Sequence, residues 1–161
     1  MMVELPITAF CLMGNNGYDK IEITITELMG FPERTSFEGG YDFKGTLTIC
    51  VGSYNVRFNN YFSTTGILYN LLTSLVPCYN SLEGTAEYRH MYEKSFYFTL
   101  KMTRTGHAMI EGVFREYPHL PNNLVFQFET DQTYIQDTIR ELKQVEKLFG
   151  DNKGLRSEAR Y

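Results

Sequence analysis

Residues that carry out metal or acid–base chemistry are few in this sequence, and they are widely spaced. The histidines are His90, His107 and His119. None of them has a second His, Cys or carboxylate at the spacing of a ligand motif such as HxH or HExxH. The sequence therefore predicts no metal site.

Nucleophilic catalysis requires a nucleophile, a base and an orienting group. The chain has no GxSxG elbow, and its three cysteines stand apart from one another: Cys11, Cys50 and Cys78. The Gly39-Gly40 pair is not followed by GK[ST], so it forms no phosphate loop. We expect no catalytic residue, no cofactor and no enzymatic activity. Because catalytic residues need only meet in space, an enzyme stays open as a less favoured alternative.

Acidic and aromatic side chains predict a partner-binding surface instead. The segment from Phe37 to Asp42 combines aromatic rings, acids and flexible glycines, a composition typical of binding surfaces. Further acids fall on the polar phase of predicted strands, where they form the solvated face of a one-sided sheet. The predicted partner contacts are Phe37, Glu38, Tyr41, Asp42, Glu111 and Glu129. The alternative for the loop is a linker whose aromatic rings pack on the core.

Length and charge narrow the class of protein. A chain of 161 residues favours one domain with its own core. The formal net charge of −4, with no cluster of basic residues, disfavours nucleic-acid binding. No stretch approaches the ~20 apolar residues of a membrane span. Three scattered cysteines, an odd number, fit a reducing compartment, so we expect a cytoplasmic protein.

Alternation of apolar and polar residues predicts about seven strands, because it gives a strand one buried face and one solvated face. The alternating segments lie near residues 21–26, 46–51, 54–59, 85–90, 96–102, 108–114 and 124–129. Gly52-Ser53 fits a two-residue hairpin turn. Short connections in the second half favour antiparallel neighbours.

In two segments the apolar residues recur with the period of a helix. Apolar residues recur every four positions from Ile67 to Val76, with Thr64 or Thr65 placed to cap the helix and Pro77 to end it. The second stripe runs from Ile135 to Phe149, after Asp131 as the N-cap and before a terminating glycine.

The expected fold is α+β, an antiparallel sheet of about seven strands with two helices packed on one face. The alternative is a strongly curled sheet that approaches a barrel, with sharp bends at Gly45 and Gly112. Residues 20–150 form the expected domain, and 151–161 a flexible C-terminal tail. Residues 1–19 are an extension or an edge strand. The uncharged run Ile7–Met13 has high β-propensity, so we expect it to be sequestered in the sheet or across a homodimer contact.

Three stretches resemble one known family. Ser81-Leu82-Glu83-Gly84-Thr85-Ala86-Glu87-Tyr88 is similar to a helix-to-strand junction of the WapI-like immunity proteins. Asp131 to Ile135, continuing to Arg140-Glu141-Leu142, is similar to the family's closing helix, and Ile21-Glu22-Ile23 matches its first strand. The resemblance covers about residues 20–149.

The resemblance implies a bacterial immunity protein that neutralises a cognate toxin domain by stoichiometric binding. It supplies no binding residues by motif, so the partner contacts above rest on composition alone. A small-ligand-binding or structural α+β domain is the alternative, and it requires an apolar cavity with convergent polar groups between helices and sheet.

Overall fold

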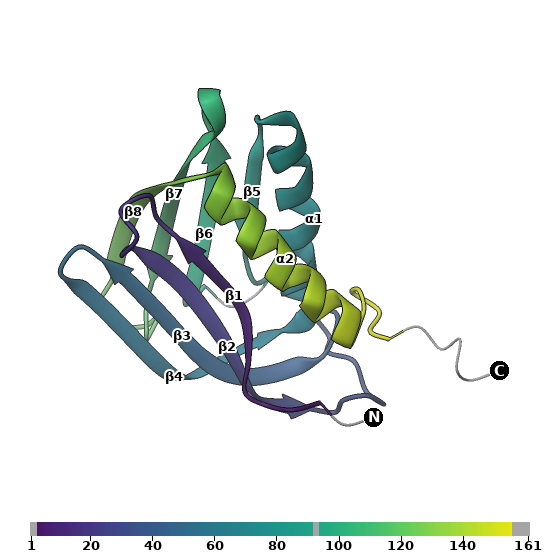
Figure 1. The fold of residues 1–161 in the computed structure, drawn as a ribbon. Coiled ribbons are helices and arrows are strands. Elements are labelled where there is room, and N and C mark those ends of the chain that lie inside the picture. The colour runs from purple at the N-terminus through teal and green to yellow at the C-terminus, as the bar shows by residue number, and fades with distance from the viewer. Residues whose placement is uncertain (1–2, 92–93, 156–161) are drawn as a thin grey trace.

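The structure, a computed structural model, describes residues 3–91 and 94–155, which form two four-stranded antiparallel sheets and two helices (Figure 1). Sheet A contains, in order, β1 (Ile7–Met13), β2 (Lys20–Met29), β3 (Asp42–Val51) and β4 (Tyr54–Thr64). Sheet B contains β5 (Thr85–Tyr88), β6 (Phe96–Met102), β7 (His107–Phe114) and β8 (Leu124–Asp131). Helix α1 (Thr65–Ser81) connects the sheets, a short 3₁₀ turn (Arg104–Gly106) precedes β7, and α2 (Gln132–Phe149) follows β8.

The α+β class and the antiparallel pairing are confirmed, but the strands number eight and form two sheets. The physical reason is α1, whose 17 residues separate β4 from β5 and prevent the two strands from pairing as a hairpin. The inner faces of the two sheets pack together. The ring centres of Phe10 on β1 and Phe98 on β6 are 6.2 Å apart. Those of Phe58 on β4 and Phe114 on β7 are 5.7 Å apart.

The predicted alternation matches the strands of both sheets. Ile21, Ile23 and Ile25 are fully buried in β2. The predicted two-residue turn between β3 and β4 is confirmed, because Val51 pairs with Tyr54 and Gly52 has a φ of 57°, which favours glycine. Of the two glycines considered for sharp bends, Gly45 lies next to a shift in the register between β3 and β4, whereas Gly112 pairs with Phe98 and Phe126 in registers without a shift.

Strand β1 is an edge strand of sheet A, and α2 lies alongside it (Figure 1). The backbone N–H of Cys11 donates to Glu141 Oε1 at 3.0 Å, and Thr138 Oγ1 donates to the Cys11 carbonyl at 3.3 Å. Two side chains of the helix thus take the place of a neighbouring strand. An uncovered apolar edge would be an aggregation site, so this contact explains how the Ile7–Met13 run is sequestered.

Helix α1 begins where the sequence predicts, because Thr64 Oγ1 accepts the backbone N–H of Ile67 at 3.1 Å. The prediction that Pro77 ends it is wrong, since the helix continues to Ser81. Only one turn follows Pro77, and Ser81 Oγ donates to the Pro77 carbonyl at 2.8 Å. The proline therefore interrupts the helical hydrogen bonds only near their end.

After α2 the chain turns back toward the loop between β2 and β3. Asp151 and Gly154 form an isolated bridge, and the backbone N–H of Leu155 donates to the Tyr41 hydroxyl at 3.0 Å. Of the tail expected at 151–161, residues 156–161 lie outside the described residues.

Candidate partner-binding site

Where β4 and β5 end, four polar side chains form a closed ring inside the protein. The hydroxyl of Tyr88 lies 2.7 Å from both the Tyr61 hydroxyl and Ser63 Oγ, and His90 Nε2 lies 3.1 Å from each of the latter two atoms. None of the four residues is more than 5% exposed. Burial raises the pKa of Tyr88 far above its usual value, so its hydroxyl keeps its proton at neutral pH and can donate a hydrogen bond.

Glu38 joins this ring to two loops. Its Oε2 lies 3.6 Å from His90 Nδ1 and accepts the backbone N–H of Met91 at 3.2 Å. The Glu38 side chain is 19% exposed, so the carboxylate lies at the boundary between the ring and solvent. We call Glu38, Tyr61, Ser63, Tyr88 and His90 the Glu38 network.

The network contains a hydroxyl, an imidazole and a carboxylate in the order of a catalytic triad. Its geometry differs from a triad at both ends. The Glu38–His90 distance of 3.6 Å is too long for the hydrogen bond that orients a catalytic imidazole. Ser63 is 4% exposed, and its Oγ also contacts the Tyr88 hydroxyl. The arrangement satisfies buried polar groups and holds the ends of β4 and β5 together.

Sequence reasoning missed the ring because its members come from two strands separated by α1. A signal was present in each strand. Tyr61 and Ser63 stand two residues apart on the inward phase of β4, and Tyr88 and His90 have the same spacing, with Tyr88 the last residue of β5 and His90 just beyond it. Polar residues at inward positions near the ends of two strands need partners, and here they supply one another.

Exposed apolar side chains stand directly beside this network in the chain. Phe37 precedes Glu38 and is 87% exposed, Phe62 precedes Ser63 and is 54% exposed, and Met91 follows His90 and is 70% exposed. Phe62 also lines a hollow of about 230 Å³ that Glu38 and His90 of the network share. It is lined by Met29, Glu38, Asp42, Phe43, Phe62, Ser63, Thr64 and His90. We call Phe37, Phe62, Met91 and this hollow the Phe37 surface.

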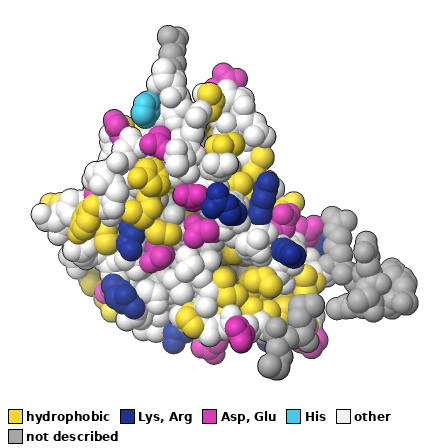
Figure 2. All heavy atoms as spheres, viewed as in Figure 1, with side chains coloured by type: hydrophobic (Ala, Val, Ile, Leu, Met, Phe, Trp, Pro, Cys, Tyr) yellow, Lys and Arg dark blue, Asp and Glu magenta, His cyan; other side chains and the backbone are white. Residues whose placement is uncertain are grey.

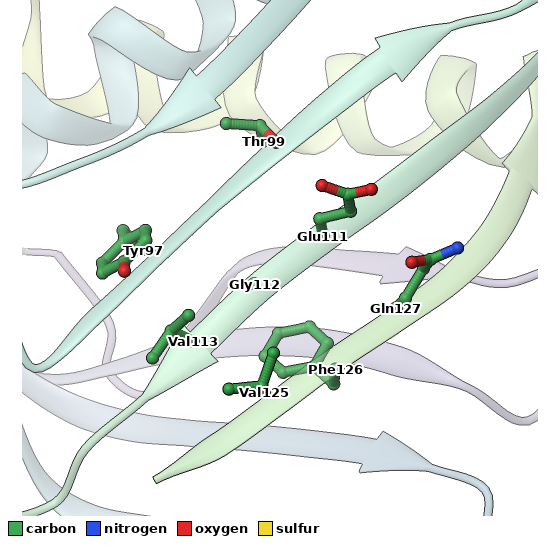
Figure 3. Close-up of a pocket in the computed structure, with 8 residues that line it drawn as sticks. All are labelled: Tyr97, Thr99, Glu111, Gly112, Val113, Val125, Phe126 and Gln127. Atoms are coloured by element: carbon green, nitrogen blue, oxygen red, sulfur yellow. The ribbon is translucent and has the colours of Figure 1, made fainter.

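A second hollow, of about 470 Å³, lies on the outer face of sheet B (Figure 3). Its lining comes from β6, β7 and β8: Tyr97, Thr99, Glu111, Gly112, Val113, Val125, Phe126 and Gln127. Gly112 forms part of the floor, and a Cβ at this position would collide with the ring of Phe126. The missing side chain is therefore what lets the Phe126 ring occupy this place.

The predicted partner contacts divide between these two places. Glu111 and Glu129 are exposed on the outer face of sheet B, and Glu111 lines its hollow. Phe37, Glu38 and Asp42 belong to the other end of the molecule, where Glu38 and Asp42 line the smaller hollow. The two hollows share no lining residue.

Tyr41 differs from the other predicted contacts because it is only 2% exposed. Its hydroxyl donates to the Pro32 carbonyl at 3.2 Å, and its ring packs edge-on against Phe31 with centres 4.9 Å apart. The alternative proposed for this loop therefore applies to Tyr41, whose ring packs on the core. We leave Tyr41 out of the surfaces considered below.

The family model described as "Immunity protein WapI-like family" matches residues 11–150. This range includes the whole Glu38 network and all of sheet B. The chain belongs to the WapI-like immunity protein family. It is therefore an immunity protein, a protein that neutralises a toxin.

One chain of a solved structure is similar to this WapI-like immunity protein. That structure is described as "CdiA-CT/CdiI toxin and immunity complex from Enterobacter cloacae". The two chains are 16% identical and superpose with a TM-score of 0.42, and the match covers 70% of this chain and 94% of the other. The comparison with curated proteins gives no match.

The surface of this immunity protein carries charges of both signs. Figure 2 shows acidic and basic side chains intermixed on one face, with apolar side chains in small patches between them. Among residues 3–91 and 94–155, no group of three or more His, Cys, Asp or Glu side chains is placed to hold a metal ion. No helix in these ranges is long and apolar enough to cross a membrane.

Proposed function

We propose that this immunity protein neutralises its toxin by binding the toxin domain in a one-to-one complex, without changing the toxin chemically. Membership of the family carries the proposal, since the role of an immunity protein requires contact with a toxin. The Glu38 network supports binding over catalysis, because its serine is buried and its carboxylate is too far from the imidazole to orient it.

The charge of the chain favours a basic partner. Acidic residues exceed basic ones by four. A toxin domain that acts on nucleic acid needs Lys and Arg to neutralise phosphates, so its active surface would attract this protein. Glu111 and Glu129 are exposed on sheet B, where they can accelerate the encounter without being buried in the final contact.

Small-ligand binding is the second candidate function, and the hollow in Figure 3 is the observation that favours it. Its volume of about 470 Å³ is within the range of ligand sites. It lies, however, on the outer face of a sheet rather than between helices and sheet. Ligand sites cover most of the ligand surface, so we favour toxin binding.

The free cysteines Cys11, Cys50 and Cys78 fit a reducing compartment, and we propose the cytoplasm as the location. The proposed role requires this protein to meet the toxin domain there.

Isothermal titration of the purified cognate toxin domain tests the proposal. We expect a stoichiometry of one, and toxin activity that falls in proportion to the immunity protein added. Light scattering on the free protein shows whether it is a monomer or a homodimer. The stoichiometry is then calculated from the concentration of that species. Protection at a small fraction of one equivalent would contradict the proposal.

A further inference from the structure

We infer that the Phe37 surface is the anchor by which this protein holds its toxin, and that the toxin presents an apolar cleft beside a Lys or Arg side chain. The inference rests on the proposed function and assigns it a contact surface. Phe37, Phe62 and Met91 supply the apolar contacts. Glu38 and Asp42 supply the charge opposite the toxin's cation.

The three apolar side chains share one supporting framework. Each is the chain neighbour of a residue in the Glu38 network, so the network holds the backbone beneath all of them. Phe37 and Met91 stand on different loops, which the bond from the Met91 N–H to Glu38 Oε2 ties together. Scattered exposed apolar residues are normal on proteins, but these three are all linked to Glu38: Phe37 by the chain, Met91 by its N–H, and Phe62 by the hollow that it lines with Glu38.

The loop that carries Phe37 has a fixed backbone. The N–H of Gly40 donates to the Asn152 carbonyl at 2.7 Å, and the N–H of Tyr41 donates to Thr65 Oγ1 at 2.8 Å. Phe37, with a side chain that is 87% exposed, thus stands on a tied segment. Binding through such a segment costs little ordering entropy, and aromatic side chains are enriched among the residues that dominate interfaces.

The hollow of the Phe37 surface is acidic. Glu38 and Asp42 both line it, and the Asp42 side chain is exposed. The lining contains no Lys or Arg among the described residues, and the Nδ1 of its histidine, His90, faces Glu38 at 3.6 Å. A Lys or Arg side chain of the toxin would meet a carboxylate at the mouth and backbone-supported apolar groups around it. This charge also matches the basic partner proposed above.

Surface plasmon resonance with the toxin domain tests the inference, using Phe37→Ala and Met91→Ala with Tyr54→Ala and Val125→Ala as controls. The controls remove exposed apolar side chains elsewhere, 66% and 74% exposed. We expect Phe37→Ala to raise Kd by about 30-fold through faster dissociation, because loss of a central aromatic contact has effects of this size. Met91→Ala should have a smaller effect in the same direction, and the controls should bind as the unaltered protein does. Melting temperatures should be unchanged, since all four side chains are exposed.

Asp42→Asn tests the charge separately. We expect slower association at low salt and the same association rate as the unaltered protein at high salt, where charges are screened. If the unaltered protein binds one-to-one but Phe37→Ala and Met91→Ala bind equally well, the inference is wrong and the proposed function stands. If Phe37→Ala changes the size of the free protein instead, a second copy occupies this surface and the inference is again wrong. If the unaltered protein does not bind the toxin, the proposed function itself fails.

Discussion

Two regions of this molecule combine glutamates with tyrosines, and they use them in different ways. In the Glu38 network, Tyr61 and Tyr88 are buried and their hydroxyls are 2.7 Å apart. On the outer face of sheet B, Glu111 is exposed and Tyr97 is half-buried, with the Arg89 guanidinium 5.4 Å from its ring centre.

The difference follows from whether solvent reaches the polar groups. A buried polar group must find a partner, so the network fixes the backbone around it and its loss destabilises the fold. An exposed carboxylate is already hydrated, so it contributes charge to the surface and little to stability. We therefore expect substitutions in the network to change the free energy of unfolding, and substitutions on sheet B to change association rates.

The largest effect should come from His90→Ala. The substitution removes a contact of both Tyr61 and Ser63 and leaves a gap in the core, so we expect a loss of about 2–4 kcal/mol in the free energy of unfolding. His107→Ala is the matched control, because His107 is exposed, and it should change stability by at most about 0.5 kcal/mol. Urea unfolding measures both. Equal effects would remove the distinction between the two regions.

Gly112→Ala should have the next largest effect, and it tests the one buried feature of the sheet B hollow. The new Cβ would meet the ring of Phe126, which is 5% exposed and packed in the core. We expect a loss of about 1–3 kcal/mol from overpacking. Adding Phe126→Leu to this variant should recover part of the loss by making room, as thermal unfolding of the single and double variants would show. If the double variant is no more stable than Gly112→Ala, the loss of stability does not come from contact with the Phe126 ring.

The sequence predicted much of this fold because its signals are local. Alternation located the strands, and Thr64 and Asp131 cap the helices as expected, with Asp131 Oδ1 accepting the backbone N–H of Thr133 at 2.9 Å. The division into two sheets depends on pairing between distant segments, which alternation does not encode. The Glu38 network escaped prediction for the same reason, since Tyr61 and Tyr88 are 27 residues apart.

Glu141 is intermediate in exposure between the buried Glu38 network and the exposed glutamates of sheet B. The residue is half-buried, and its carboxylate accepts a hydrogen bond from the edge of β1. Burial is the largest cause of the raised pKa of Glu141, so the folded protein disfavours its ionised form. Stability from this group is therefore present below its unfolded pKa and is lost as pH rises through the raised folded pKa.

Glu141→Gln keeps an oxygen to accept the Cys11 N–H and removes the ionisation. We expect the stability of Glu141→Gln relative to the unaltered protein to increase as pH rises from about 4 to about 7. Urea unfolding of both proteins across this range gives the difference, in which effects of other carboxylates cancel. A difference that is constant with pH, or that falls, would contradict the assignment.

The smallest effect on stability should come from replacing both Glu111 and Glu129 with Gln. Both carboxylates are exposed, so unfolding should change by at most about 0.5 kcal/mol. Association with the toxin should slow several-fold at low salt and match the unaltered protein at high salt. Stopped-flow mixing at two salt concentrations measures this. A faster dissociation with unchanged association would instead make this face part of the buried contact.

The central claim is that this protein neutralises its toxin by binding alone. Recovery of the toxin from the complex tests this claim most directly. The complex is separated in denaturant, the immunity protein is removed, and the toxin domain is refolded beside toxin that never met its partner. We expect equal activity and an unchanged mass for the two toxin samples. A recovered toxin that stays inactive or has gained or lost mass would show chemical modification and contradict the account.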